Sequence, residues 1–230
     1  MTTGPRPLYL LADSQLLFWK SRTGPFLASV LQASASTSPT VAYIGASNGD
    51  SAEAYSIFTA AIEQAKVSDI RRVSSSPSQQ DLGFVKEADV VVLAGGDPEI
   101  GWNVFTRTGL RNAIESRYRS GGLLIGVSAG AVQFGTHATV PGDSGESRLI
   151  ETFGFVKLIV AAHDEKQDWR TLAGTIGLLE GASVGVGIPH GGGLIAHPDG
   201  TLEPIRHAVD EFTYSGGKLH RAVLLPDLEA

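Results

Sequence analysis

One serine in the chain has neighbours that could make it a nucleophile. Residues 126–131 read GVSAGA and directly follow the apolar residues 123–125. A serine has no packing role there, because its hydroxyl needs a hydrogen-bond partner and glycines weaken a strand. The stretch fits the pattern G-x-S-x-G, in which a sharp strand-to-helix turn exposes the hydroxyl, here that of Ser128. A glycine-lined turn with a capping serine has the same sequence, so the pattern alone leaves both interpretations open.

A serine nucleophile also needs a general base, and the base needs an acceptor that fixes its tautomer. His163 directly follows the apolar residues 158–162 and is a candidate base, with a structural histidine as the alternative. The polar stretch GDSGES (142–147) lies between Ser128 and His163 and offers two carboxylates. Serine, acid and histidine in this chain order make a workable catalytic set.

A pair of glycines ends a third apolar run. In Ala94-Gly95-Gly96-Asp97, the glycines would let backbone N–H groups face the place where Ser128 is expected. The helix expected after Ser128 would point its free N–H groups there too, so an oxyanion would find donors ready. A glycine pair before Asp-Pro also favours an ordinary turn, which is the alternative.

Short apolar strands that alternate with longer segments of helical period would position these residues. Several of the strands are apolar on both faces, which is typical of parallel sheets covered by helices. The intervening segments are long enough for crossovers. The pattern predicts strands at 8–11, 40–44, 69–73, 89–93, 123–127, 158–162, 184–188 and 194–196, and helices at 51–65 and 110–118.

The predicted fold is α/β, a doubly wound and mostly parallel sheet flanked by helices, with a short C-terminal β-rich stretch over 184–224. In such sheets ligands bind beyond the carboxyl ends of the strands, where Ser128, Gly96 and His163 are expected. The chain has 230 residues, 42% of them apolar. Because a chain of this size can bury about 70% of its unfolded surface, we expect residues 1–230 to form a single domain.

The composition excludes several classes of function. The formal charge is −6, with 24 acidic and 18 basic residues and no basic cluster, so we expect no nucleic-acid partner. The absence of cysteine excludes disulfides, thiolate metal sites and a cysteine nucleophile. No signal-peptide pattern and no apolar run of about 20 residues is present, which predicts a cytoplasmic protein without a membrane partner.

Acidic residues beside His163 raise the question of a metal site. The spacing of Asp164, Glu165 and Asp168 fits no familiar set of metal ligands, and a polar rim is the preferred interpretation. We therefore expect neither a metal nor another cofactor.

Four stretches of the sequence resemble the peptidase E (aspartyl dipeptidase) and cyanophycinase family of serine peptidases. The fold of that family is similar to class I glutamine amidotransferases and is flavodoxin-like. The resemblance runs from about residue 8 to residue 195. The stretches that carry it are AYIGASNGD (42–50), VVVLAGGDPEIGWN (90–103), GGLLIGVSAGAVQFG (121–135) and VKLIVAAHDEKQDWR (156–170).

The resemblance implies a role for several of the residues identified above. By motif position, Ser128 is implied as the nucleophile and His163 as the base. Gly96, together with the backbone of Ala129, is implied to line the oxyanion hole, and Gly95 is the alternative to Gly96.

The resemblance also implies a third catalytic residue and a substrate. An acid is expected in the loop after the nucleophile, and Asp143 is preferred over Glu146. The implied activity is hydrolysis of small peptides, as by a dipeptidase or aminopeptidase, with a preference for N-terminal Asp. An acidic side chain of the substrate needs a cationic partner, for which Arg148, Arg170 and Lys166 are candidates. For each of them the alternative interpretation is a solvated surface charge without a role in binding.

Two other functions stay open. An α/β-hydrolase esterase also uses G-x-S-x-G, and PHGGG (189–193) resembles the oxyanion motif of lipases, although that motif belongs upstream of the nucleophile. An esterase would take its base from His207 or His220. A non-catalytic binding module is the third possibility, since fold does not fix function. The expected partner is a small peptide substrate, and the sequence leaves both a monomer and a homodimer open.

Overall fold

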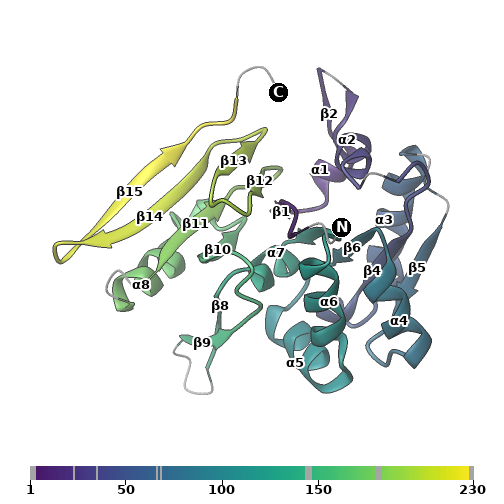
Figure 1. The fold of residues 1–230 in the computed structure, drawn as a ribbon. Coiled ribbons are helices and arrows are strands. Elements are labelled where there is room, and N and C mark those ends of the chain that lie inside the picture. The colour runs from purple at the N-terminus through teal and green to yellow at the C-terminus, as the bar shows by residue number, and fades with distance from the viewer. Residues whose placement is uncertain are drawn as a thin grey trace.

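The computed structural model describes residues 4–22, 24–34, 36–65, 67, 69–142, 147–179 and 183–227, and a central sheet runs through it (Figure 1). The sheet has seven strands, of which the last five in the order below are parallel and the first two antiparallel to their neighbours. The order is β13 (Leu202–Ile205), β12 (Gly193–Ala196), β1 (Leu8–Leu11), β7 (Leu123–Val127), β6 (Val90–Leu93), β4 (Val41–Ile44) and β5 (Ile70–Val73).

Alternate residues of each parallel strand enter different hydrophobic layers, which explains why these strands are apolar on both faces. In β6, Val91 and Leu93 belong to one buried cluster, and Val90 and Val92 belong to the other. Helices cover both layers. The first layer is covered by α4 (Gln79–Glu87), α5 (Pro98–Thr108), α6 (Leu110–Arg119) and α7 (Ala129–Phe134), and the second by α1 (Gln15–Phe18), α2 (Phe26–Gln32) and α3 (Ala52–Gln64). The predicted doubly wound, mostly parallel α/β sheet is confirmed.

A second sheet lies beside the central one, on the left in Figure 1. Its order is β10 (Leu158–Ala162), β11 (Val184–Ile188), β14 (Val209–Ser215) and β15 (Lys218–Leu224). The first two strands are parallel, and the last two form an antiparallel hairpin. The sequence pattern does not separate β10 and β11 from the central sheet, because both kinds of strand are short apolar runs.

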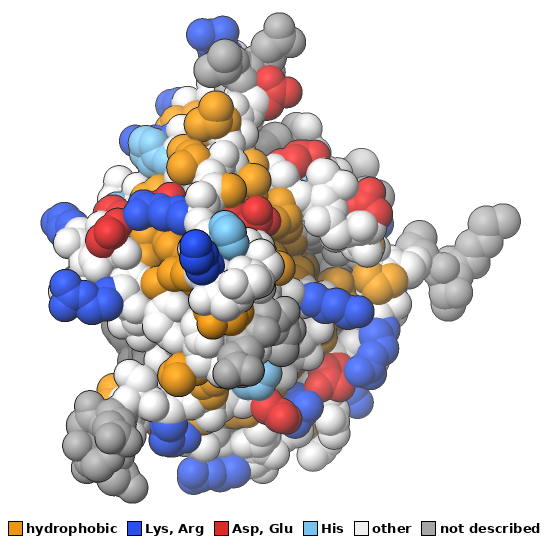
Figure 2. All heavy atoms as spheres, turned by 90° about the vertical axis from the view of Figure 1, so that its left-hand side faces the viewer, with side chains coloured by type: hydrophobic (Ala, Val, Ile, Leu, Met, Phe, Trp, Pro, Cys, Tyr) orange, Lys and Arg blue, Asp and Glu red, His pale blue; other side chains and the backbone are white. Residues whose placement is uncertain are grey.

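One helix packs against the second sheet through a buried tryptophan. Trp169 precedes α8 (Arg170–Leu178), and its side chain is fully buried. A Cβ on Gly187 would lie 2.5 Å from the indole ring, so the glycine of β11 makes room for it. The indole Nε1 donates to Asp210 Oδ2 at 2.7 Å, which satisfies its single donor. On the face of the molecule that carries this sheet, basic and acidic side chains are interspersed with hydrophobic patches (Figure 2).

Short elements complete the part of the chain that the structure describes. The predicted C-terminal β-rich stretch is present as the hairpins β12–β13 and β14–β15. No helix among the described residues is long and apolar enough to cross a bilayer. The remaining elements are β2 (Lys20–Ser21), β3 (Gly24–Pro25), β8 (His137–Pro141), β9 (Ser147–Glu151) and the 3₁₀ turns η1 (Ala46–Asn48) and η2 (Glu165–Gln167).

Candidate active site

Ser128 occupies a sharp turn between β7 and α7. Its φ of 49° and ψ of −109° lie outside the regions that residues with a side chain normally adopt. Two glycines make the turn possible. A Cβ on Gly126 would lie 2.5 Å from the carbonyl carbon of Gly130, and one on Gly130 would lie 2.3 Å from the Leu93 carbonyl oxygen. The Ser128 N–H donates to the Leu11 carbonyl at 2.8 Å, which ties the turn to β1. The turn thus has the shape expected of a nucleophile elbow.

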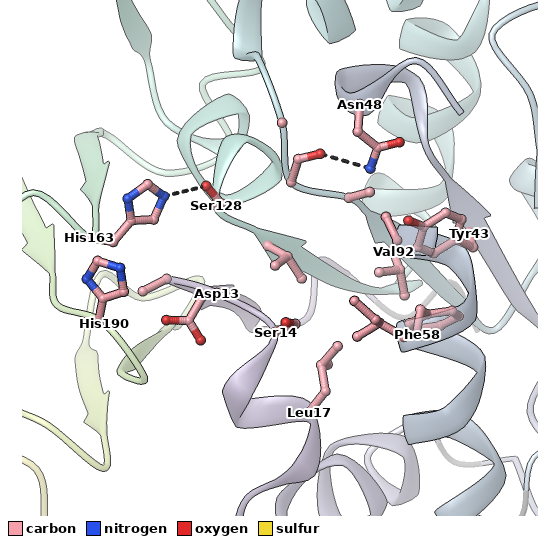
Figure 3. Close-up of a pocket in the computed structure, with 17 residues that line it drawn as sticks. Asp13, Ser14, Leu17, Tyr43, Asn48, Phe58, Val92, Ser128, His163 and His190 are labelled. Carbon is pink, nitrogen blue, oxygen red and sulfur yellow. Dashed lines mark hydrogen bonds between the residues drawn. The ribbon is translucent and has the colours of Figure 1, made fainter. Parts of the chain in front are cut away.

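His163 reaches Ser128 from the second sheet. It follows β10 with a φ of 49°, and its backbone N–H donates to the Ile188 carbonyl at 2.9 Å. The Ser128 Oγ and the His163 Nε2 lie 2.8 Å apart (Figure 3). This distance is within the range needed for proton transfer between a nucleophile and its base. For Nε2 to accept the serine proton, the imidazole proton must be on Nδ1.

A second histidine lies next to the first. The ring centroids of His163 and His190 are 5.2 Å apart, and His190 Nδ1 lies 2.8 Å from Glu165 Oε1. The pKa of the Glu165 carboxyl is lowered overall. Burial alone would raise this pKa, but it is outweighed by hydrogen bonds from the backbone N–H groups of Glu165 and His190 and from the His190 ring. Glu165 is therefore an anion at neutral pH, and it holds the His190 ring in place.

Two of the predicted oxyanion-hole residues, Ala129 and Gly95, lie next to Ser128, and Gly96 follows Gly95 in the chain. Ala129 is the first residue of α7, so its N–H has no partner within the helix. Gly95 lies against the serine, since a Cβ on it would be 3.3 Å from the Ser128 Cβ. Gly96 has a φ of +135°, and a Cβ there would lie 2.1 Å from the Ser47 carbonyl oxygen. Only glycine fits the position of Gly96.

The prediction that the Gly96 N–H is an oxyanion donor implies that Gly96→Ala lowers kcat by about 10²-fold or more, the effect of losing one such donor. The added Cβ must displace the Ser47 backbone or change the backbone conformation at Gly96. Steady-state kinetics and thermal unfolding measure the two effects. Gly200→Ala is the control, because Gly200 also has a positive φ, +92°, but has no atom within 4 Å of the added Cβ. Equal losses of activity in both variants would contradict a role for Gly96 at the site.

A cavity of about 430 Å³ opens in front of Ser128. His163 and His190 lie on one side of it, and Tyr43, Phe58 and Val92 lie on the other (Figure 3). The volume falls within the roughly 300–1,000 Å³ of small-ligand sites.

The structure does not bring the predicted cationic residues to this cavity. Arg148 is in β9 and forms an ion pair with Glu99. Arg170 is exposed at the start of α8, and Lys166 is exposed in η2. None of these residues is among those that line the cavity, so their contact with a substrate stays a prediction.

The structure does not place the predicted acids, and it does not bring the alternative histidines to the cavity. Asp143 and Glu146 lie outside the residues that the structure describes. His207 follows β13 and His220 is in β15, and neither lines the cavity. Among the described residues, no group of three or more His, Asp or Glu side chains could hold a metal ion.

Asp13 and His190 both line the cavity, although neither has a role predicted from the sequence. Asp13 follows β1, which pairs in parallel with the strand that ends at Ser128. His190 follows β11, which pairs in parallel with the strand that ends at His163. Because the carboxyl ends of neighbouring parallel strands meet at one edge, polar residues just after these strands are the signal that identifies both.

Comparison with known proteins decides the family. The family model described as Peptidase family S51 matches residues 14–197, which include Ser128, His163 and the glycines of the elbow. The chain belongs to peptidase family S51. This S51 protein is accordingly a serine-type peptidase.

Two solved structures share the fold of the S51 peptidase. A peptidase from an acI-B1 actinobacterium has a TM-score of 0.66 at 18% identity, over 98% of this chain and 96% of that one. A candidate peptidase E protein from Listeria monocytogenes EGD-e has a TM-score of 0.62 at 13% identity, over 96% of this chain and 99% of that one. No curated protein sequence matches the chain. At these identities the two structures support the predicted fold class.

Proposed function

We propose that this S51 peptidase hydrolyses small peptides through an acyl-enzyme formed on Ser128. The observation that carries the proposal is the 2.8 Å distance between the Ser128 Oγ and the His163 Nε2 in the wall of the cavity. The serine oxygen attacks the peptide carbonyl while His163 takes its proton. His163 then donates the proton to the leaving amine, and a water molecule, deprotonated by His163, hydrolyses the ester.

Backbone N–H groups stabilise the negative charge in this mechanism. The N–H groups of Gly96 and Ala129 serve as the oxyanion donors, one from the loop after β6 and one from the start of α7. The strained backbone at Ser128 presents its hydroxyl to His163, 2.8 Å away. Fixed donors of this kind need no reorganisation when the charge develops.

The third member of the triad is an acid that fixes the Nδ1–H tautomer of His163. Asp143 is the first candidate and Glu146 the second. Glu165 is a further carboxylate near the site, since it bonds to His190 beside His163.

Amide variants of the three carboxylates identify the acid. Asp143→Asn is expected to lower kcat by about 10³–10⁴-fold, because an amide in place of the acid favours the wrong imidazole tautomer. Glu146→Gln and Glu165→Gln are matched controls, and we expect kcat to fall far less in each of them. A large loss confined to either control would assign the acid to that residue instead of Asp143.

The proposed substrates are small peptides. The cavity binds the residue whose carbonyl belongs to the cleaved bond. Family resemblance implies a preference for N-terminal Asp. Because the described residues that line the cavity include no Lys or Arg, they offer such a side chain no permanent cation. We therefore propose the broader class, small peptides with a free N-terminus.

A hydrolysis panel of dipeptides and tripeptides tests the proposed function. Products are identified by mass spectrometry for the wild type and for Ser128→Ala. We expect new free amines from the wild type and none from the variant. Hydrolysis of simple esters but of no peptide would favour an esterase, and hydrolysis of neither would favour a binding module.

A further inference from the structure

The cavity beside Ser128 has an apolar side and a polar side. Apolar side chains from α1, β4, α3 and β6 lie across the cavity from the two histidines (Figure 3), and Val127 of β7 also lines the cavity. Burial raises the pKa of the Tyr43 phenol, so this group is neutral as well. Ile57 precedes Phe58 on α3, lines the cavity and is 41% exposed, so a bound apolar group would cover it. The larger apolar residues are Leu17, Tyr43, Ile57, Phe58, Val92 and Val127.

The polar side holds the single carboxylate among the described residues that line the cavity, Asp13. Its Oδ2 accepts from the Gly191 N–H at 2.7 Å, and its Oδ1 accepts from the Gln15 N–H at 2.8 Å. The Gln15 Nε2 also donates to Oδ2, at 3.5 Å. A carboxylate has about four acceptor sites, so these donors fix its position and leave capacity for a ligand. In Figure 3, Asp13 lies beside His190 on the histidine side of the cavity.

The charges of the site disfavour an anionic side chain in the cavity. His163 must be neutral to act as a base, and any charge on His190 is offset by Glu165 at 2.8 Å. Arg72 is near the apolar side, but it stacks on Tyr55 and donates to the Asp50 carbonyl, and it does not line the cavity. A carboxylate among the apolar residues would lose its hydration without gaining a cationic partner from the described residues that line the cavity.

The three substituents of an N-terminal residue match these positions. Its carbonyl must reach Ser128, and its side chain and its ammonium group leave the same carbon in different directions. The apolar side of the cavity then faces the side chain, and Asp13 faces the ammonium group. We propose that the cavity binds an N-terminal residue with an uncharged, apolar side chain, such as Leu or Phe, and that Asp13 binds its ammonium group. This inference rests on the proposed peptidase function.

Three substrates test the preference for an apolar side chain and the binding of the ammonium group separately. They are Leu-Ala, Asp-Ala, and an analogue of Leu-Ala in which a hydroxyl replaces the ammonium group. For the wild type we expect kcat/KM for Leu-Ala to exceed that for Asp-Ala by about 10²-fold or more, because the carboxylate would be desolvated without a cationic partner. The analogue is expected to be poorer than Leu-Ala by about 10–100-fold, since its neutral hydroxyl cannot form the ion pair that the ammonium group forms with Asp13.

Asp13→Asn removes the charge but keeps an oxygen for the Gly191 N–H. We expect it to raise KM for Leu-Ala by about 10-fold or more and to raise KM for the analogue far less, because only the ammonium group forms an ion pair with the carboxylate. Asp199→Asn is the control, since Asp199 also accepts from a backbone N–H but lies in the turn between β12 and β13. An equal loss of kcat on both substrates in Asp13→Asn would overturn ammonium binding by Asp13.

A cation introduced at the apolar side should reverse the preference. Ile57→Arg places a guanidinium at an exposed helix position, and we expect it to raise kcat/KM for Asp-Ala relative to Leu-Ala by about 10-fold or more. Ala60→Arg is the matched control, because Ala60 is exposed on the same helix but does not line the cavity. An unchanged ratio in Ile57→Arg would overturn the assignment of this side to the substrate side chain.

The same assays separate failure of this inference from failure of the proposed function. Cleavage of Asp-Ala in preference to Leu-Ala, lost in Ser128→Ala, would overturn the apolar preference and leave the peptidase function standing. Absence of any Ser128-dependent cleavage of the two dipeptides would overturn both.

Discussion

Ser128→Ala is expected to lower kcat by about 10⁴–10⁶-fold, because it removes the nucleophile and leaves only the oxyanion donors and substrate binding. The fold should be unchanged, since alanine keeps the Cβ and the Ser128 hydroxyl bonds within the described residues only to His163. Steady-state kinetics on the best peptide of the panel measures the loss, and circular dichroism checks the fold.

Ser14→Ala is the matched control for this variant. Ser14 also lines the cavity, and its side chain does not cap α1. We expect its kcat to change by less than about 10-fold, because its hydroxyl takes no part in bond formation. Retained turnover in Ser128→Ala, or an equal loss in Ser14→Ala, would contradict Ser128 as the nucleophile.

His163→Ala is expected to lower kcat by a similar factor, about 10⁴–10⁶-fold, because the members of a catalytic triad act as a unit. Without the imidazole, the serine hydroxyl has no base at 2.8 Å. Combining Ser128→Ala with His163→Ala should add little to either single loss, which a double-mutant cycle measures.

The alternative histidines serve as controls for the second prediction. His207 and His220 do not line the cavity, and we expect His207→Ala and His220→Ala to keep activity near that of the wild type. A large loss in either variant with little loss in His163→Ala would favour the esterase arrangement over the one described here.

The elements around the site were largely predictable from the sequence. The strands predicted at 123–127, 158–162 and 184–188 have these bounds in the structure. Each is an apolar run that ends at a glycine, a proline or a polar residue, so local pattern alone marks both ends. The elbow at Ser128 was visible for the same reason, because small residues on both sides are a steric requirement of the turn.

The arrangement of sheets depends on contacts that local pattern does not encode. β10 pairs with β11 and not with the central sheet, so His163 approaches Ser128 from a separate sheet. Residues 35 positions apart meet there, and their distance is set by the packing of two sheets rather than by spacing in the sequence. The sequence therefore predicts that serine and histidine lie near one sheet edge, whereas their contact distance requires the three-dimensional structure.

The substrate-binding role of charged residues such as Arg148 was the hardest feature to predict from the sequence. Arg148 has Glu99 as a partner in the structure, and sequence gives no sign of this ion pair across 49 residues. The apolar side of the cavity was missed for a related reason. Most of its residues belong to the apolar faces of α1, α3 and the strands. The sequence of such a face is the same whether the face packs against a neighbouring helix or binds a ligand.

Labelling with a serine-reactive phosphonate tests the central claim most directly. The probe phosphonylates an activated serine, and peptide mapping by mass spectrometry locates it. We predict one label per chain, on Ser128, with labelling lost in Ser128→Ala and slowed by orders of magnitude in His163→Ala. A folded wild-type protein that takes up no label, or takes it up at another serine, would contradict a nucleophile at this turn.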